Sequence, residues 1–254
     1  MGFKMGIVGL PNVGKSTLFN ALTKTASAQA ANFPFCTIEP NIGEVSVPDA
    51  RLDNLAKIAQ SQNVIPARMT FVDIAGLVKG ASKGEGLGNQ FLANIREVDA
   101  VAHVLRCFED TDVTHVEGRV DPLADAETIE TELMLADIES IEKRLQNLSR
   151  KVRGGDKDAV QQERLLNSAL TQLEKGLPAR SVEVAEEDQK AWQMLQLLTA
   201  KPILYVCNVE ENSSANGNSH SEKVIEMAVS QDARAVIISA QIEEEISQLE
   251  ADEA

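Results

Sequence analysis

Apolar residues gather in six short runs along the chain, and helical patterns lie between most of them. The strand-like runs fall at 3–8, 42–47, 69–74, 100–107, 202–207 and 235–239. The helical patterns fall at 15–25, 51–60, 88–97 and 220–230. Strands and helices that alternate in this way predict an α/β fold, with a mostly parallel sheet and helices on both of its faces.

Residues 128–175 break this alternation with two longer helical patterns. The first has a coiled-coil-like seam, with apolar residues at spacings of 4, 3, 4, 3 and 4: Met134, Ile138, Ile141, Leu145, Leu148 and Val152. Gly154 and Gly155 suit a helix end, and Asp156 suits the start of a new helix. The return helix has its own apolar face: Val160, Leu165, Leu166, Ala169, Leu170 and Leu173. With a further helix expected over 186–199, we predict an inserted α-helical coiled-coil hairpin over 128–199.

Four basic residues fall at the predicted hairpin tip: Arg150, Lys151, Arg153 and Lys157. They are interpreted either as solvated charge or as a docking surface for an anionic partner, and the sequence leaves both open. The chain as a whole is acidic, with a net charge of −15 over 254 residues. Broad attraction to nucleic acid and sequence-specific DNA binding are therefore not expected.

Cysteine usage and hydropathy point to the cytoplasm. Cys36, Cys107 and Cys207 are widely spaced and fit reduced thiols, two of them in apolar runs. No apolar run approaches the ~18 residues needed to span a bilayer. We expect a cytoplasmic monomer with no membrane partner.

The strongest chemical signal is the stretch Gly9-Leu10-Pro11-Asn12-Val13-Gly14-Lys15-Ser16-Thr17. It has the form G-x-x-x-x-G-K-S, lies between a strand-like and a helical pattern, and predicts a phosphate-binding P-loop. Lys15 would reach the β- and γ-phosphates, and the Ser16 hydroxyl would hold Mg²⁺. The expected nucleotide contacts here are Asn12, Val13, Gly14, Lys15, Ser16 and Thr17. Residues 1–127 and 200–254 would then form one discontinuous nucleotide-binding domain.

Two further stretches favour a switch NTPase over a kinase or a motor. Asp73 and Gly76 form a D-x-x-G pattern at the end of an apolar run, where Asp73 would bind Mg²⁺ and Gly76 would contact the γ-phosphate. Thr37 lies between this pattern and the P-loop and is the candidate switch threonine, with its hydroxyl on Mg²⁺. Lys15, Thr37 and Gly76 are therefore candidate catalytic residues.

Three stretches together resemble a known family, the YchF-type Obg-like ATPases: residues 9–17, 32–41 and 73–89. The resemblance runs along nearly the whole chain, including the hairpin turn at 154–157. It implies a translation-factor-related NTPase that associates with ribosomes and prefers ATP to GTP. Relatives of this type usually continue into a small β-rich TGS domain, and we expect that domain to be absent from a chain that stops at Ala254.

The stretch Asn208-Val209-Glu210-Glu211 stands where a GTPase carries N-K-x-D, and Ser239-Ala240 stands where S-A-K would follow. Asn208, Val209, Glu211, Ser239 and Ala240 are the candidate base-side residues. The aspartate that would bind guanine is replaced by Glu211, so we expect ATP to bind at least as well as GTP. Asn208 would either contact the base or brace the P-loop. A GTP-preferring Obg-like GTPase and a nucleotide-gated adaptor with negligible hydrolysis remain alternatives.

The hydrolytic step is less well defined. Leu77 follows the D-x-x-G pattern where many switch GTPases have a glutamine that orients water, so slow turnover is expected. His115 is a candidate substitute for that group, or an exposed surface histidine. Asn12 is a candidate K⁺ ligand near the phosphates, or a loop residue that bonds to its own backbone.

Overall fold

A six-stranded sheet forms the centre of the molecule in the computed structural model, which describes residues 2–30, 41–74, 87–110 and 119–249. Its strands are β1 (Phe3–Val8), β2 (Ile42–Ser46), β3 (Arg68–Asp73), β4 (Ala100–Arg106), β5 (Ile203–Asn208) and β6 (Arg234–Ile238). They lie in the order β2-β3-β1-β4-β5-β6. Only β2 is antiparallel to its neighbour. The predicted mostly parallel α/β sheet is confirmed.

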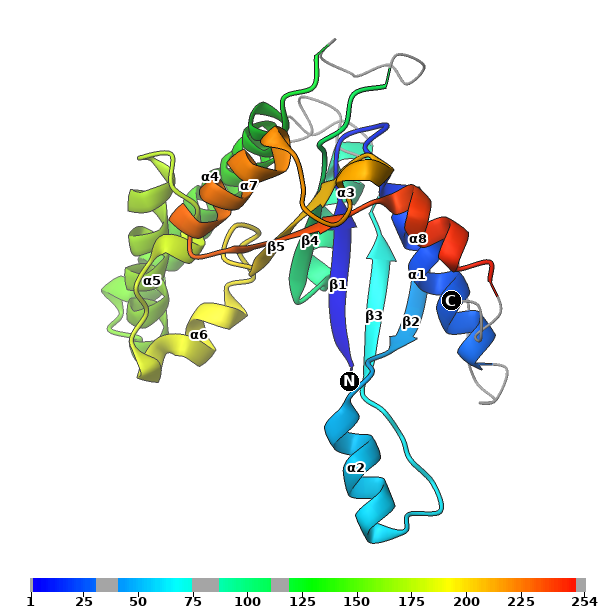
Figure 1. The fold of residues 1–254 in the computed structure, drawn as a ribbon. Coiled ribbons are helices and arrows are strands. Elements are labelled where there is room, and N and C mark those ends of the chain that lie inside the picture. The colour runs from blue at the N-terminus through cyan, green and yellow to red at the C-terminus, as the bar shows by residue number, and fades with distance from the viewer. Residues whose placement is uncertain (1, 31–40, 75–86, 111–118, 250–254) are drawn as a thin grey trace.

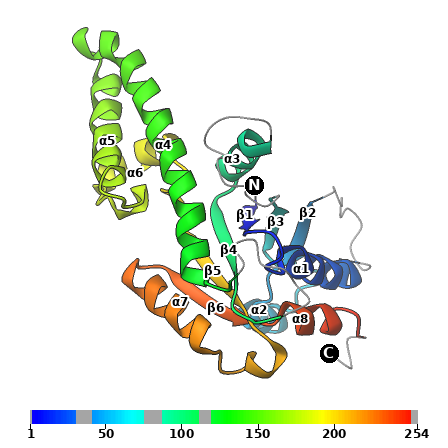
Figure 2. The same cartoon turned by 90° about the horizontal axis from the view of Figure 1, so that it is seen from above.

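Helices flank this sheet on both sides (Figures 1 and 2). Their bounds are α1 (Lys15–Ala30), α2 (Ala50–Ala59), α3 (Leu87–Glu97), α4 (Pro122–Arg153), α5 (Lys157–Leu173), α6 (Gln189–Met194), α7 (Ser219–Ser230) and α8 (Ala240–Ile246). Short 3₁₀ turns cover Ala179–Ser181, Glu186–Asp188 and Glu211–Ser213. Helices α1 and α8 pack against each other, and α7 packs beside β6 and α4. None of the helices in the described ranges is long and apolar enough to cross a membrane.

The long helix α4 belongs to two hydrophobic cores. Its first half contributes Ile129, Leu133 and Ala136 to the core that covers the sheet. Further along, Ile141 packs into a second core with Leu166 of α5 and Trp192 of α6. The second half of α4 and α5 therefore project from the sheet as a helical hairpin (Figure 2).

The hairpin turn forms where the glycines predicted it. Gly154 is the C-cap of α4, and Gly155 adopts a positive φ of 75°, which a residue without a Cβ reaches at little cost. Asp156 then caps α5, since its carboxylate accepts a hydrogen bond of 3.0 Å from the backbone N–H of Ala159. The basic residues around this turn are exposed.

Three details differ from the prediction. Val160, expected on the apolar face of α5, is 45% exposed, because it lies near the turn beyond the hairpin core. Helix α4 begins at Pro122, before residue 128, because Asp121 caps it by accepting from the N–H of Ala124 at 3.2 Å. The helix predicted over 186–199 is shorter: α6 ends at Met194, and Gln196 has a left-handed φ of 50°. The division into domains itself remains a prediction.

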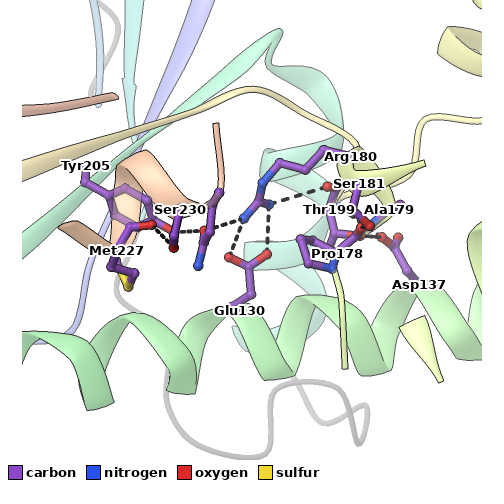
Figure 3. A network of polar contacts seen from close by, with 11 residues as sticks. Glu130, Asp137, Pro178, Ala179, Arg180, Ser181, Thr199, Tyr205, Met227 and Ser230 are labelled. Carbon is purple, nitrogen blue, oxygen red and sulfur yellow. Dashed lines mark hydrogen bonds and ion pairs between the residues drawn. The ribbon is translucent and has the colours of Figure 1, made fainter. Parts of the chain in front are cut away.

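A polar network joins the hairpin to the sheet at the root of the hairpin, where Glu130 of α4 meets Arg180 after α5 (Figure 3). Arg180 donates two hydrogen bonds of 2.8 Å to the carboxylate of Glu130 in α4. The same guanidinium donates to Gln231 at 3.2 Å, and the Tyr205 hydroxyl of β5 donates to Gln231 at 2.9 Å. These contacts join α4 and the segment after α5 to β5 and the end of α7.

A second anchor lies two helical turns further along α4. The buried carboxylate of Asp137 accepts from the backbone N–H of Leu198 and of Thr199, each at 2.9 Å, and from the Thr199 hydroxyl at 2.7 Å. Burial raises the pKa of Asp137, and these hydrogen bonds oppose that rise. The chain that returns from the hairpin is therefore held to α4 just before it enters β5.

The two described cysteines confirm the expected core placement. Cys107 and Cys207 are both buried in the cluster beneath α7. A hydrogen bond with Cys207, together with burial, raises the pKa of Cys107. Cys36 lies outside the described residues.

Candidate functional site

The loop between β1 and α1 has the backbone that a phosphate-binding loop requires. Asn12 and Gly14 adopt positive φ angles of 64° and 90°. A Cβ at Gly14 would overlap the Nδ2 atom of Asn208, so this position needs glycine both for its φ and for its close neighbour. The backbone N–H of Leu18 donates to the Gly14 carbonyl at 3.0 Å and continues the loop into α1.

A cleft of about 630 Å³ opens beside this loop. The P-loop residues Asn12, Gly14, Lys15, Ser16 and Thr17 line it, whereas Val13 of the same predicted set is buried and does not. The remaining lining comes from Leu10, Pro11, Asn41, Asp73, Gln90, Phe91 and Asn94. This cleft is large enough for a nucleotide-sized ligand.

The charged groups of the cleft meet at its floor. The ammonium of Lys15 forms an ion pair with the Asp73 carboxylate, and the Ser16 hydroxyl lies 3.5 Å from the other carboxylate oxygen. A hydroxyl and a carboxylate are the hard oxygen donors that Mg²⁺ prefers, and Mg²⁺ usually keeps several waters besides. Ser16 and Asp73 therefore fit the predicted metal, with Lys15 beside them as the cation for the phosphates.

Asn208 braces the P-loop from the end of β5. Its Nδ2 donates to the Val13 carbonyl at 2.9 Å, and its Oδ1 accepts from the backbone N–H of Ala240 at 2.9 Å. The residue is 5% exposed. One side chain thus holds the phosphate loop and the start of α8 together, which was one of the two roles that the sequence left open.

The other predicted base-side residues surround Asn208. Val209 is buried, with its side chain in the core beneath α7, and Glu211 is exposed. The Ser239 side chain accepts from the backbone N–H of Ile242 at 3.5 Å and caps α8. None of these three residues lines the cleft beside the P-loop, and their role on the base side stays a prediction.

Sequence reasoning missed the contribution of α3. Gln90, Phe91 and Asn94 line the cleft together with the P-loop residues. The available signal was the spacing of two amides at i and i+4 on the first helix after the D-x-x-G pattern. Thr37, Gly76 and His115, which the sequence analysis also proposed, lie outside the described residues.

Comparisons with known proteins agree with this geometry. A family model described as a 50S ribosome-binding GTPase matches residues 4–136. The Ribosome-binding ATPase YchF of Bacillus subtilis is 52% identical over 255 residues, which cover all of this chain and 69% of the relative. The chain belongs to the YchF family. The YchF of Haemophilus influenzae is 53% identical over 253 residues, again 69% of its length.

The fold is that of a solved YchF as well. The structure of the Schizosaccharomyces pombe YchF GTPase superposes with a TM-score of 0.83 at 37% identity and covers 99% of this chain and 69% of that one. This chain thus shares its α/β P-loop fold with a YchF from a yeast.

Proposed function

We propose that the protein binds and hydrolyses ATP and acts as a nucleotide-dependent switch. The observation that carries the proposal is the meeting of Lys15, Ser16 and Asp73 on the floor of a cleft beside a P-loop. Positioned cations and oxygen ligands at this point are what phosphoryl transfer to water requires. The relatives' printed name, ribosome-binding ATPase, describes the same activity.

The preference for ATP follows from the base side of the site. The Asn208 amide carries two N–H groups, of which Val13 takes one, so the second is available to the N7 atom that adenine and guanine share. Selection for guanine in N-K-x-D comes from the aspartate, which accepts from guanine N1–H and N2–H₂. Glu211 stands at that position on an exposed 3₁₀ turn. Losing a bidentate charged contact removes about 1–3 kcal/mol of discrimination in favour of GTP.

The cofactor proposal is Mg²⁺ held by Ser16 and Asp73, with Thr37 as a third ligand in the triphosphate state. The bound ion would neutralise charge on the phosphates. Asn12, which lines the cleft, is proposed as a ligand for K⁺. A twofold or greater difference between rates in K⁺ and Na⁺ buffers supports the K⁺ site, and equal rates reject it.

Turnover is proposed to be slow, because Leu77 has no group that orients water. Gly76 is proposed to sense the γ-phosphate, and His115 is proposed to act on the attacking water. Hydrolysis by His115→Ala at the wild-type rate would remove His115 from the proposal.

The proposed setting is a cytoplasmic monomer whose nucleotide state changes its affinity for a ribosome. The support is the printed name of the relatives and the exposed basic residues at the hairpin tip. A charged tip on a projecting hairpin suits an anionic partner such as ribosomal RNA. We propose no membrane partner and no sequence-specific DNA binding.

The deciding experiment measures binding of ATP and GTP by calorimetry and hydrolysis of both in the presence of Mg²⁺. We expect ATP to bind at least as tightly as GTP and to be hydrolysed. GTP binding tenfold tighter would favour the alternative of a GTP-preferring switch. ATP binding without single-turnover hydrolysis would favour a nucleotide-gated adaptor. Lys15→Ala is the control, because normal hydrolysis by that variant would identify a contaminant.

A further inference from the structure

Among the described residues, the group that orients the attacking water is still to be assigned; His115, proposed above to act on that water, lies outside them. Leu77 has an apolar side chain where many switch GTPases place a glutamine. A glutamine suits this task because its amide oxygen accepts from the water while its amide N–H donates to a phosphate oxygen. A residue that replaces it must bring the same two functions to the γ-phosphate end of the site.

The cleft beside the P-loop is that end. Lys15, Ser16 and Asp73 line it, and these residues serve the β- and γ-phosphates and the metal. The base-side residues Asn208 and Ala240 do not line it. Polar side chains that line this cleft therefore border the region where water would approach the γ-phosphate.

Two carboxamides of α3 line this cleft as well. Gln90 and Asn94 are separated by four residues on α3, so they lie one above the other on the same side of the helix. Both line the cleft; Gln90 is exposed and Asn94 is half-buried. Their chemistry is the same as that of the glutamine that Leu77 replaces.

Helix α3 holds these amides on a fixed support. Leu92 and Ile95, on its other side, are buried in the core that covers the sheet. At its end, the Lys201 ammonium donates to the carbonyl of Arg96 at 3.1 Å and to the carbonyl of Val98. Partial burial lowers the pKa of Lys201, and the nearby carboxylates of Asp99 and Asp137 oppose that change. A helix secured at its face and its end holds its backbone in place, so the positions from which these amides project are fixed.

We infer that the amides of Gln90 and Asn94 orient the attacking water, an inference that rests on the proposed function. One amide oxygen accepts a hydrogen bond from the water, and an amide N–H donates to a γ-phosphate oxygen. The water oxygen then forms a bond to the γ-phosphorus as the bond to the bridging β–γ oxygen breaks. The water proton passes to the released phosphate, and ADP leaves with the bridging oxygen.

The test replaces each amide by an apolar side chain of similar size, in Gln90→Leu, Asn94→Leu and the double variant. Single-turnover hydrolysis at saturating ATP is expected to fall by roughly tenfold to a hundredfold in the double variant. This is at or below the lower end of the effect of groups that transfer a proton, since the amides only orient the water. The dissociation constant for ATP, measured by calorimetry, is expected to stay within about threefold, since these groups act in the transition state. The charge-changing variant Gln90→Glu is expected to hydrolyse ATP more slowly than wild type as well, because it loses the N–H donor.

Glu97→Gln is the matched control, because Glu97 is exposed on the same helix and does not line the cleft. It should hydrolyse ATP at the wild-type rate. Wild-type rates in Gln90→Leu, Asn94→Leu and the double variant would overturn the inference, most clearly if His115→Ala abolishes hydrolysis in parallel. Loss of ATP binding in the double variant would also overturn it, since the amides would then serve binding. If the wild-type protein hydrolyses no more ATP than Lys15→Ala, it is the proposed function that fails.

Discussion

Two ion pairs of nearly equal burial serve opposite purposes in this molecule. Lys15 and Asp73 in the cleft have side chains that are 11% and 12% exposed. Arg180 and Glu130 at the hairpin root are 15% and 14% exposed. The first pair lines a cleft. The second pair is joined by two hydrogen bonds and has Gln231 and the Thr199 carbonyl as further partners (Figure 3).

The difference shows which surroundings would let a mostly buried charge exchange its ion-pair partner for a ligand, and which surroundings keep the ion pair fixed. A charge with one direct partner among the described residues, on an open cleft, would be able to exchange that partner for a phosphate or a metal without disturbing the fold. A planar guanidinium with several partners has no such freedom, because every lost hydrogen bond leaves a polar group desolvated. Stability is therefore expected to depend on the root, and ligand binding on the cleft.

The largest expected effect is at the root. Arg180→Met leaves the Glu130 carboxylate without its cation, and we expect it to lower the free energy of unfolding by about 3 kcal/mol, at the lower end of the range for broken buried pairs because both groups are slightly exposed. Urea denaturation measures this change. The double variant Arg180→Met with Glu130→Met should recover part of the loss, and Arg150→Met at the exposed tip should be nearly neutral. A neutral Arg180→Met would contradict the comparison.

The next effect concerns ligand binding. Lys15→Ala removes the cation of the cleft, and we expect ATP binding to weaken by about 1.5–3 kcal/mol, the usual size of a hydrogen bond to a charged group. Calorimetry measures this loss. Stability should change by about 1 kcal/mol or less, because Asp73 borders an open cleft that water enters. Lys4→Ala, an exposed lysine on the same strand–loop unit, should bind ATP normally.

A third effect is a loss of stability at acid pH, caused by a buried histidine of β4. His103 is 2% exposed, and its ring lies 5.8 Å from that of Tyr205. Burial, with a smaller contribution from the positive charge of Arg180, lowers the pKa of His103 from 6.5 to about 3. Between these values the unfolded chain binds a proton that the folded chain does not, so stability falls as pH falls.

The expected loss is about 1.4 kcal/mol per pH unit below pH 6.5, or roughly 2 kcal/mol by pH 5. Urea denaturation at pH 7, 6 and 5 measures it. His103→Phe removes the titrating group and should flatten this part of the pH profile. An unchanged slope in that variant would assign the acid sensitivity to other groups.

The smallest effect is expected far from both ion pairs. Asp156→Ala removes the cap of α5 and should lower stability by about 1 kcal/mol. Thermal unfolding checks this. ATP affinity should be unchanged, because the cap lies at the far end of the hairpin. Asp158→Ala, in the same first turn, should cost less, since Asp158 is not the capping residue.

The cleft was largely predictable because its chemistry lies in contiguous motifs. Residues 9–17 form one contiguous motif, which predicts both the loop conformation and the N–H groups expected to face phosphate. Asp73 ends the strand that lies beside β1, with Ile7 opposite it. Asn208 was only half predictable: its position after a strand was clear, but its bonds to Val13 and Ala240 join segments that are 195 and 32 residues away.

The contacts at the hairpin root could not be predicted, because, like those of Asn208, they join residues far apart in the sequence. Arg180 meets Glu130 and Gln231 across separations of 50 and 51 residues, and no local pattern relates them. Likewise, the apolar pattern placed Val160 on the apolar face of the return helix. Such a pattern shows which side of a helix is apolar, but not how far along the helix the packed core extends. The helix expected over 186–199 ended early because a left-handed residue, Gln196, carries no strong sequence signal.

Helix α4 continues without a break from the sheet core into the hairpin, so any rotation of the helix at the sheet would be magnified at the tip. From the anchor at Asp137 to Arg153 at the tip, the sixteen steps along the helix span about 24 Å at 1.5 Å per residue. A rotation of about 10° at the anchor would therefore carry the tip through roughly 4 Å, by the same helical rise. The same rotation that leaves the anchor almost in place would thus move the basic tip by about the width of a side chain.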